Sequence, residues 1–185
     1  MAINTAEVLM IKKYSFRQLN HADIDKAYSI ICSRVQYLLS RNIKQYAEPY
    51  PPKELFAERR KKGHNFGLYD GNELTAIVSI IPNHIPDCWI EYKPKINFAW
   101  VTSLFSSEKH NGKNLGYVTM KEVEKYLLSQ KIYFLLLDCY VDDGDYLVSY
   151  YNNINYKEIV RKEICYPTHT FTAALMAKTL ETDTQ

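Results

Sequence analysis

A short turn rich in glycine, asparagine and lysine is the segment of this chain best suited to bind an anion. Gly112 has no Cβ and Asn114 tolerates positive φ, so both residues favour a tight loop. The turn opens a helix expected to end near Gln130, and the first amides of a helix lack partners within it. Those amides and the helix dipole attract phosphate groups, and Lys109 and Lys113 add positive charge. We therefore expect this turn to bind a phosphate or pyrophosphate.

The spacing of the turn excludes two common nucleotide-binding loops. It does not end in Gly-Lys-Ser or Gly-Lys-Thr, and it lacks the triple-glycine spacing of a dinucleotide fingerprint. A strand is expected before the helix, over residues 97–106, and the apolar run over residues 133–137 suits a second strand covered on both faces. Strand, helix and strand in this order predict a right-handed crossover between parallel strands. The helix face expected to lie on this sheet carries Gly116, Met120, Val123 and Leu127.

Two sequence motifs, at residues 111–116 and 150–156, occur together in one known family. The first consists of Asn111, Gly112, Lys113, Asn114, Leu115 and Gly116. It resembles the R-G-x-G-x-G pyrophosphate loop of the GCN5-related N-acetyltransferases (the GNAT superfamily), with Asn111 at the usual Arg or Gln and Asn114 at a glycine. The second, which begins Tyr150-Tyr151, resembles the family segment Y-Y-E-x-x-G-F, with Asn155 at the glycine, where asparagine tolerates left-handed backbone. The resemblance in element order extends over residues 13–178.

The resemblance implies an α/β (α+β) fold of the GNAT type. Its central sheet would be mixed and mostly antiparallel, with about seven strands splayed between strands 4 and 5, and about four helices would flank it. We expect a single acetyltransferase domain over residues 1–185, with an N-terminal extension over residues 1–12 and a C-terminal tail over residues 179–185. A chain of 185 residues with 46% hydrophobic residues is long enough to bury the core of such a domain.

The same resemblance implies an N-acetyltransferase that moves an acetyl group from acetyl-CoA to a primary amine by direct attack. Backbone groups of Leu104 and Ser106 would pair with the pantetheine arm of coenzyme A, and residues 111–116 would hold the pyrophosphate. A backbone amide in the same strand could polarise the thioester carbonyl. Tyr151 matches the family's tyrosine that protonates the leaving thiolate. A phenol suits that role because its ordinary pKa, about 10, lies close to that of an alkyl thiol.

The proton acceptor for the amine stays open in the sequence. The expected strand over residues 97–106 contains no carboxylate, which leaves Thr102 and Ser103 to orient a water. The other possible proton carriers are Glu48, Glu91, His84 and Asp138. For Asp138 we expect a structural role instead, as a hydrogen-bond acceptor at a strand end. Cys139 is a weak candidate for a covalent nucleophile because no histidine lies near it in the sequence to activate it.

Aromatic and acidic residues mark a candidate acceptor site: Tyr37, Glu48, Trp89 and Trp100. Such a pocket suits a small cationic amine, such as a polyamine, an amino sugar or an amino-acid derivative. A protein N-terminus or lysine is a second choice. A catalytically degenerate GNAT fold that binds acyl-CoA or a protein partner without turnover is the alternative from another functional class. The acyl-chain length that the chain would accept is also open.

Composition narrows the remaining function classes. A net charge of +2 argues against a nucleic-acid partner, and no window is long and apolar enough for a membrane span. The four cysteines are scattered without the spacing of a disulfide framework or zinc site, and the five histidines show no ligand spacing, so we expect no metal and a cytoplasmic location. A homodimer is compatible with the resemblance, with residues 170–177 as the candidate interface.

The N-terminal half carries clear element signals. We expect a strand over residues 14–19, and then a helix over residues 24–39 that begins with a capping box of Asn20 and Asp23. A short helix should follow Pro51-Pro52 and end at a Gly63 cap. A hairpin is expected over residues 65–81, with its turn at Asp70-Gly71. The long connection over residues 82–95 could form part of a binding mouth.

Overall fold

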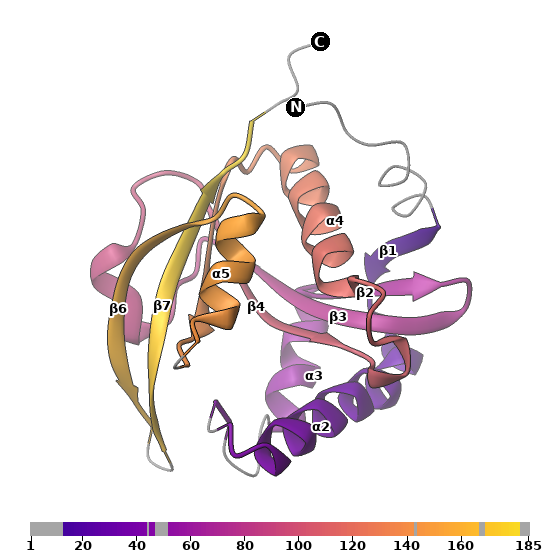
Figure 1. Cartoon of the computed structure of the whole chain (residues 1–185). Coiled ribbons are helices and arrows are strands. Elements are labelled where there is room, and N and C mark those ends of the chain that lie inside the picture. Colours follow the sequence, from indigo (N-terminus) through magenta and orange to yellow (C-terminus); the bar gives the residue numbers. More distant parts are fainter. Residues whose placement is uncertain (1–12, 44, 47–51, 143, 167–168, 182–185) are drawn as a thin grey trace. The chain divides into compact units, whose positions relative to one another are not determined.

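The computed structural model describes residues 13–43, 45–46, 52–142, 144–166 and 169–181 of the chain (Figure 1). Its internal contacts group into two compact units. The first contains residues 1–37, 49–79 and 103–123, and the second contains residues 38–48, 80–102 and 124–185. The expectation of one domain over residues 1–185 stays a prediction.

The elements follow the order expected from the sequence. They are β1 (Tyr14–Gln18), η1 (His21–Asp23), α2 (Ile24–Ser40), α3 (Lys53–Lys61), β2 (Asn65–Asp70), β3 (Glu73–Pro82), η2 (Asp87–Tyr92), β4 (Ala99–Ser106), η3 (Glu108–His110), α4 (Leu115–Ser129), β5 (Phe134–Tyr140), α5 (Tyr146–Asn153), β6 (Lys157–Cys165) and β7 (Thr170–Thr179). The strands form a seven-stranded sheet in the order β1-β2-β3-β4-β5-β7-β6. Parallel pairing of β4 with β5, beside antiparallel pairs elsewhere, confirms the mixed sheet of the expected fold class.

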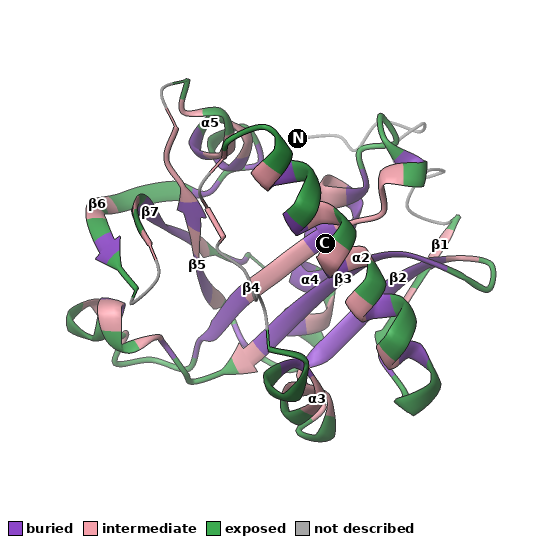
Figure 2. Ribbon diagram, turned by 90° about the horizontal axis from the view of Figure 1, so that it is seen from below, coloured by how far each residue is buried: buried purple, intermediate pink, exposed green. Residues whose placement is uncertain are grey.

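In the first unit, β1, β2 and β3 form an antiparallel meander covered by the start of α4. Leu115 and Val118 of α4 pack against Leu68 of β2 and Ala76 of β3. These two strands are almost wholly buried, as their colour in Figure 2 shows. Since both of their faces are covered, β2 and β3 carry nearly continuous apolar sequences rather than a strict alternation.

The capping box predicted before the first helix is present. Asn20 Oδ1 accepts from the amide of Ala22 at 2.8 Å, and the amide of Asn20 donates to Asp23 Oδ2 at 3.0 Å. Arg17 Nη1 donates to the same carboxylate oxygen at 2.9 Å. The capped turn is the 3-10 helix η1, and α2 begins directly after it.

Close packing explains the glycine at position 67 in β2. Its φ lies outside the left-handed region, so the backbone conformation alone does not require a glycine. A Cβ added there would lie 2.6 Å from Leu74 Cδ1, 2.7 Å from Leu19 Cδ2 and 2.8 Å from Tyr69 Cε2. We therefore expect Gly67→Ala to lower the free energy of unfolding by about 1–3 kcal/mol, since overpacking a buried site forces its neighbours to move. Denaturant titration measures this change, and an unchanged midpoint would contradict it.

In the second unit, β5, β7 and β6 form an antiparallel ribbon, and β5 pairs in parallel with β4 at Ala99 and Trp100. Both of these pairs lie in the first half of β4, and the divergence expected beyond them stays a prediction. Trp100 and Leu136 belong to an apolar cluster that also contains Trp89 of η2. The connection expected as a loop over residues 82–95 is therefore partly helical, and its tryptophan is a core residue.

A buried polar network joins α4, the short connection between α5 and β6, and β7 within the second unit. Lys178 Nζ lies 2.7 Å from Glu124 Oε1 and donates to the carbonyl of Ile154 at 2.9 Å. The hydroxyl of Tyr156 donates to Glu124 Oε1 at 3.1 Å. The side chains of Glu124 and Lys178 are each only 11% exposed. This ion pair is thus largely withdrawn from water and depends on its own hydrogen bonds.

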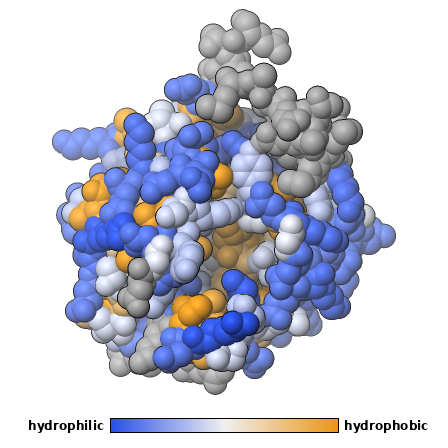
Figure 3. All heavy atoms as spheres, in the orientation of Figure 1, coloured by the Kyte–Doolittle hydropathy of each residue, from blue (hydrophilic) through white to orange (hydrophobic). Residues whose placement is uncertain are grey.

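Hydrophilic residues cover most of the face shown in Figure 3, with hydrophobic residues in small groups between them. Within the described ranges, none of the helices has the length and apolar content needed to cross a bilayer. In the same ranges, His, Cys, Asp and Glu side chains form no group of three that could hold a metal ion. Cys32, Cys88, Cys139 and Cys165 are free thiols.

Candidate active site

The turn expected to bind phosphate is an exposed loop whose backbone has the left-handed geometry that its residues favour. Gly112 has φ +81° and Asn114 has φ +52°. Asn111, Gly112, Lys113 and Asn114 are all exposed, and α4 begins immediately after them at Leu115. The loop therefore presents its backbone to solvent at the positive end of a 15-residue helix, an arrangement that favours an anion.

The loop is tied to the β2–β3 hairpin within the first unit. The amide of Ser107 donates to the carbonyl of Thr75 in β3 at 2.8 Å. His110 is buried, and its Nε2 lies 3.7 Å from Glu73 Oε2. His110 gave no recognisable sequence signal, because the contact depends on Glu73, which is 37 residues earlier in the chain.

A replacement at Gly112 tests this loop. A Cβ at Gly112 would meet no atom within 4 Å, so Gly112→Ala adds backbone strain at φ +81° without a clash. That strain amounts to about 1–2 kcal/mol for a left-handed L-residue. We expect the dissociation constant for acetyl-CoA to rise about tenfold, because about 1.4 kcal/mol corresponds to that factor. Isothermal titration calorimetry measures it.

Gly71 supplies a matched control for that replacement. It lies in the β2–β3 turn with φ +60° and equally open surroundings, so Gly71→Ala carries a similar strain outside residues 111–116. We expect it to lower stability but to leave the affinity for acetyl-CoA unchanged. Equal affinities in the two variants would remove the loop from the cofactor site.

The second half of β4 contains a left-handed residue that the sequence did not reveal. Ser103 has φ +55° in mid-strand, and Arg59 Nη1 of α3 donates to its Oγ at 3.2 Å. A non-glycine residue in this region is strained and often marks a functional site. Ser103 lies directly before Leu104, Phe105 and Ser106. Leu104 and Ser106 are half-buried, and Phe105 is buried.

Tyr151, the expected proton donor, lies on α5 in the second unit and is only 8% exposed. Its ring packs edge-on against Tyr150 and Tyr156, with centroid distances of 5.2 Å and 5.6 Å. Burial, with smaller effects of Tyr150, Cys139 and Asp138, raises the pKa of Tyr151. The phenol therefore stays protonated at neutral pH, as a proton donor must, although its pKa then lies further from that of an alkyl thiol than the ordinary value of about 10 does.

Asp138 lies in β5 and is half-buried. Its Oδ2 accepts a hydrogen bond from Trp89 Nε1 at 3.0 Å. Desolvation raises the pKa of Asp138, and the bond from Trp89 offsets part of that effect. Cys139, the next residue, is buried, and burial raises the pKa of its thiol to about 12. A thiol with such a pKa is a poor nucleophile at neutral pH.

The residues predicted to bind the acceptor do not share one environment. Tyr37 is exposed on α2, where Arg34 lies over its ring at 4.8 Å. Trp89 is 0% exposed and Trp100 is 2% exposed, and both belong to the apolar cluster of the second unit. Glu48 lies outside the described residues. The described members thus include two core tryptophans, and their role toward an acceptor stays a prediction.

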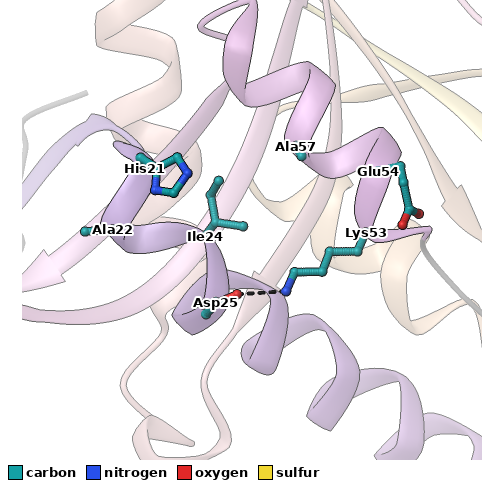
Figure 4. Close-up of a pocket in the computed structure, with 7 residues that line it drawn as sticks. All are labelled: His21, Ala22, Ile24, Asp25, Lys53, Glu54 and Ala57. Carbon is teal, nitrogen blue, oxygen red and sulfur yellow. Dashed lines mark hydrogen bonds and ion pairs between the residues drawn. The ribbon is translucent and has the colours of Figure 1, made fainter.

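A hollow of about 460 Å³ lies in the first unit between the start of α2 and α3 (Figure 4). Lys53 of α3 extends across it to Asp25, with 2.8 Å between Nζ and Oδ1. The hollow is lined by His21, Ala22, Ile24, Asp25, Lys53, Glu54 and Ala57, so it shares no residue with the predicted site.

Comparison with known proteins identifies the family. A sequence profile described as the acetyltransferase (GNAT) family matches residues 33–156. The chain belongs to the GNAT family. The match includes the loop over residues 111–116 and the α5 segment with Tyr151, so both motifs of the resemblance lie within the matched region. No curated protein matches the chain.

Solved GNAT structures share the fold over nearly the whole chain. A GNAT acetyltransferase from Listeria monocytogenes is 15% identical with a TM-score of 0.74, covering 90% of this chain and 95% of its own. The ribosomal-protein-S18-alanine N-acetyltransferase from Escherichia coli is 16% identical with a TM-score of 0.64, covering 93% and 97%. A chain of the NatC complex bound to Gag peptide and CoA is 9% identical with a TM-score of 0.66, covering 91% and 99%. At these identities the likeness establishes the GNAT fold alone.

Proposed function

We propose that this GNAT protein is an acetyl-CoA-dependent N-acetyltransferase that acetylates a primary amine of a small molecule by direct attack. The proposal rests on Tyr151, which matches the family's acid tyrosine in the sequence motif and lies buried on α5. A phenol that stays protonated can give its proton to a leaving thiolate. The CoA bound in the NatC structure supports coenzyme A as the carrier.

The proposed cofactor contacts lie in the first unit. Asn111, Gly112, Lys113, Asn114, Leu115 and Gly116 would hold the pyrophosphate, and Leu104 and Ser106 would pair with the pantetheine arm through their backbone groups. The left-handed backbone of the loop and its exposed position before α4 support the first assignment. The half-buried state of Leu104 and Ser106 leaves surface for the second. No metal takes part in this proposal.

The chemistry proceeds by addition and elimination. The neutral amine attacks the thioester carbonyl, so a C–N bond forms and a tetrahedral intermediate carries the negative charge on oxygen. The C–S bond then breaks, and the sulfur leaves with its electron pair. Tyr151 gives its proton to that sulfur, while the proton lost from the amine nitrogen restores the phenol. Positioning the two reactants contributes several kcal/mol, on the order of 7–11 in the best intramolecular cases.

A protein N-terminus is the second acceptor class that deserves a test. The similar structures include an N-acetyltransferase named for an alanine of ribosomal protein S18 and a NatC complex with a bound peptide. These names describe those proteins, and the shared fold is compatible with either acceptor. A set of amines that contains spermidine, glucosamine and a peptide with an N-terminal alanine distinguishes small-molecule acceptors from a protein N-terminus.

Thermal unfolding with acetyl-CoA, with free CoA and without ligand tests the cofactor first. A ligand that binds only the native state raises the transition temperature in a saturable way. Release of the CoA thiol in the presence of each amine then tests transfer. If acetyl-CoA binds but none of the amines causes release of the CoA thiol, the degenerate acyl-CoA-binding alternative is favoured. No shift with either ligand would overturn the cofactor assignment.

A further inference from the structure

Asp138 is a carboxylate in an unusual environment for its charge. It is half-buried, yet it forms no ion pair in the described part of the chain. Its one side-chain partner there is Trp89, which donates from Nε1 to Oδ2 at 3.0 Å. A desolvated carboxylate without a cation is costly, and such groups gather at functional sites. Its own backbone amide also stabilises the ionised form, and a carboxylate has acceptor capacity for further hydrogen bonds.

Trp89 fixes the orientation of this carboxylate. The indole is 0% exposed, packs in the apolar cluster of the second unit and forms an edge contact with Tyr92. Lys162 Nζ lies 4.6 Å from the centre of the indole ring and 2.8 Å from Glu91 Oε1. Because a tryptophan side chain can only donate, its bond to Oδ2 favours the ionised form of Asp138.

The groups that face Asp138 come from η2, β5 and α5. Its negative charge contributes to the raised pKa values of Cys88, Cys139 and Tyr151. By smaller effects, Lys162 of β6 lowers the pKa of Cys88 and Asp87 raises it. The expected proton donor, Tyr151, is therefore electrostatically coupled to Asp138. A carboxylate and a phenol in one environment form the pairing of base and acid that amine acetylation needs.

We propose that Asp138 is the general base that takes the proton from the acceptor ammonium, and that Trp89 is the residue that positions it. The proposal rests on the proposed function. An ammonium with three N–H bonds gives one proton to Asp138, and the neutral amine then attacks the thioester. The second proton leaves the nitrogen of the tetrahedral intermediate and balances the one that Tyr151 gives to sulfur. Asp138 releases its proton to solvent after each turnover.

The other described candidates suit this role less well. Glu91 is exposed, and its pairing with Lys162 lowers its pKa, so it is a weak base. His84 is exposed in the connection before η2. Desolvation instead raises the pKa of Asp138 toward the pH at which a base is effective.

Asp138→Asn tests the base. Asparagine has the same shape and still accepts from Trp89, so the fold is kept while the proton acceptor is lost. With whichever amine of the set gives the fastest thiol release, we expect kcat/KM near pH 8 to fall about 100-fold, a typical contribution of a general base. The ratio of wild-type to variant kcat/KM cancels the titration of the amine itself. This ratio should decrease as the pH is lowered and Asp138 becomes protonated.

Trp89→Phe tests the positioning role. It removes the N–H and keeps most of the ring, so the ionised form of Asp138 loses a hydrogen bond and its pKa rises. The acid limb of kcat/KM should therefore move to higher pH, while the affinity for acetyl-CoA stays unchanged. Glu91→Gln, which removes an exposed charge on the same 3-10 helix, should leave the limb where it is.

Each outcome has a separate meaning. If the wild type releases thiol and Asp138→Asn keeps both the rate and the acid limb, Asp138 is not the base, and the proposed transferase stands. If Asp138→Asn loses activity but Trp89→Phe leaves the limb unmoved, the positioning role of Trp89 is overturned. Absence of thiol release by the folded wild type with every amine overturns the proposed function, and the base with it.

Discussion

Replacing Tyr151 with phenylalanine should lower kcat by about 100-fold or more while acetyl-CoA binds as before, because proton transfer contributes about 10²–10⁴-fold to a rate. The phenyl ring keeps the edge contacts with Tyr150 and Tyr156, so only the hydroxyl is lost. Stopped-flow measurement of thiol release and calorimetry with acetyl-CoA give the two quantities separately. A variant that turns over normally at neutral and high pH would show that Tyr151 is not the acid.

Tyr150→Phe is the matched control for this experiment. Tyr150 lies next to Tyr151 on α5, and burial raises its pKa to about 12. Its hydroxyl is buried without a hydrogen-bond partner in the described part of the chain. Removing an unsatisfied buried hydroxyl should leave kcat unchanged and leave stability equal or slightly higher. A loss of activity equal to that of Tyr151→Phe would mean that the effect is not specific to the Tyr151 hydroxyl.

Replacing Lys178 with methionine should lower the free energy of unfolding by about 3–5 kcal/mol, the usual cost of breaking one side of a buried ion pair. The Glu124 carboxylate would remain largely buried and would keep the hydrogen bond from the Tyr156 hydroxyl. Urea denaturation monitored by tyrosine and tryptophan fluorescence measures the loss. A change below about 1 kcal/mol, the range of surface pairs, would contradict the description of this network as buried.

Two further variants separate charge from packing. Glu124→Gln combined with Lys178→Met removes both charges and leaves an acceptor for Tyr156, so we expect most of the lost stability to return. Asp25→Asn breaks the pair with Lys53, whose side chains are 87% and 49% exposed, and should change little. The contrast would show that position in the fold, and not the number of ion pairs, determines the stability.

Local signals explain why much of the fold could be predicted from the sequence. The capping box of Asn20 and Asp23, the Asp70-Gly71 turn and the glycine after α3 act within a few residues, and all three appear where expected. The loop before α4 could be predicted for the same reason, because Gly112 and Asn114 are residue types that favour left-handed backbone.

The missed features depend on residues far apart in the chain. Serine does not favour left-handed backbone as glycine and asparagine do, so the type of residue at position 103 did not predict this conformation. The hydrogen bond between Ser103 and Arg59 spans 44 positions. The Trp89–Asp138 bond spans 49 positions. The sequence suggested that Trp89 binds the acceptor, because no local pattern indicates that its N–H donates to Asp138 on another element.

The connection over residues 82–95 also limits how this protein can be re-engineered. Its tryptophan fills the centre of an apolar cluster, so exchanging the whole segment for a loop from another acetyltransferase would open a cavity of ring size. Ile90, in the same 3-10 helix, is 51% exposed, and His84 is exposed as well. Libraries of variants aimed at a new acceptor should therefore change Ile90 and His84 and keep Trp89, so that the variants stay soluble and are produced in good yield.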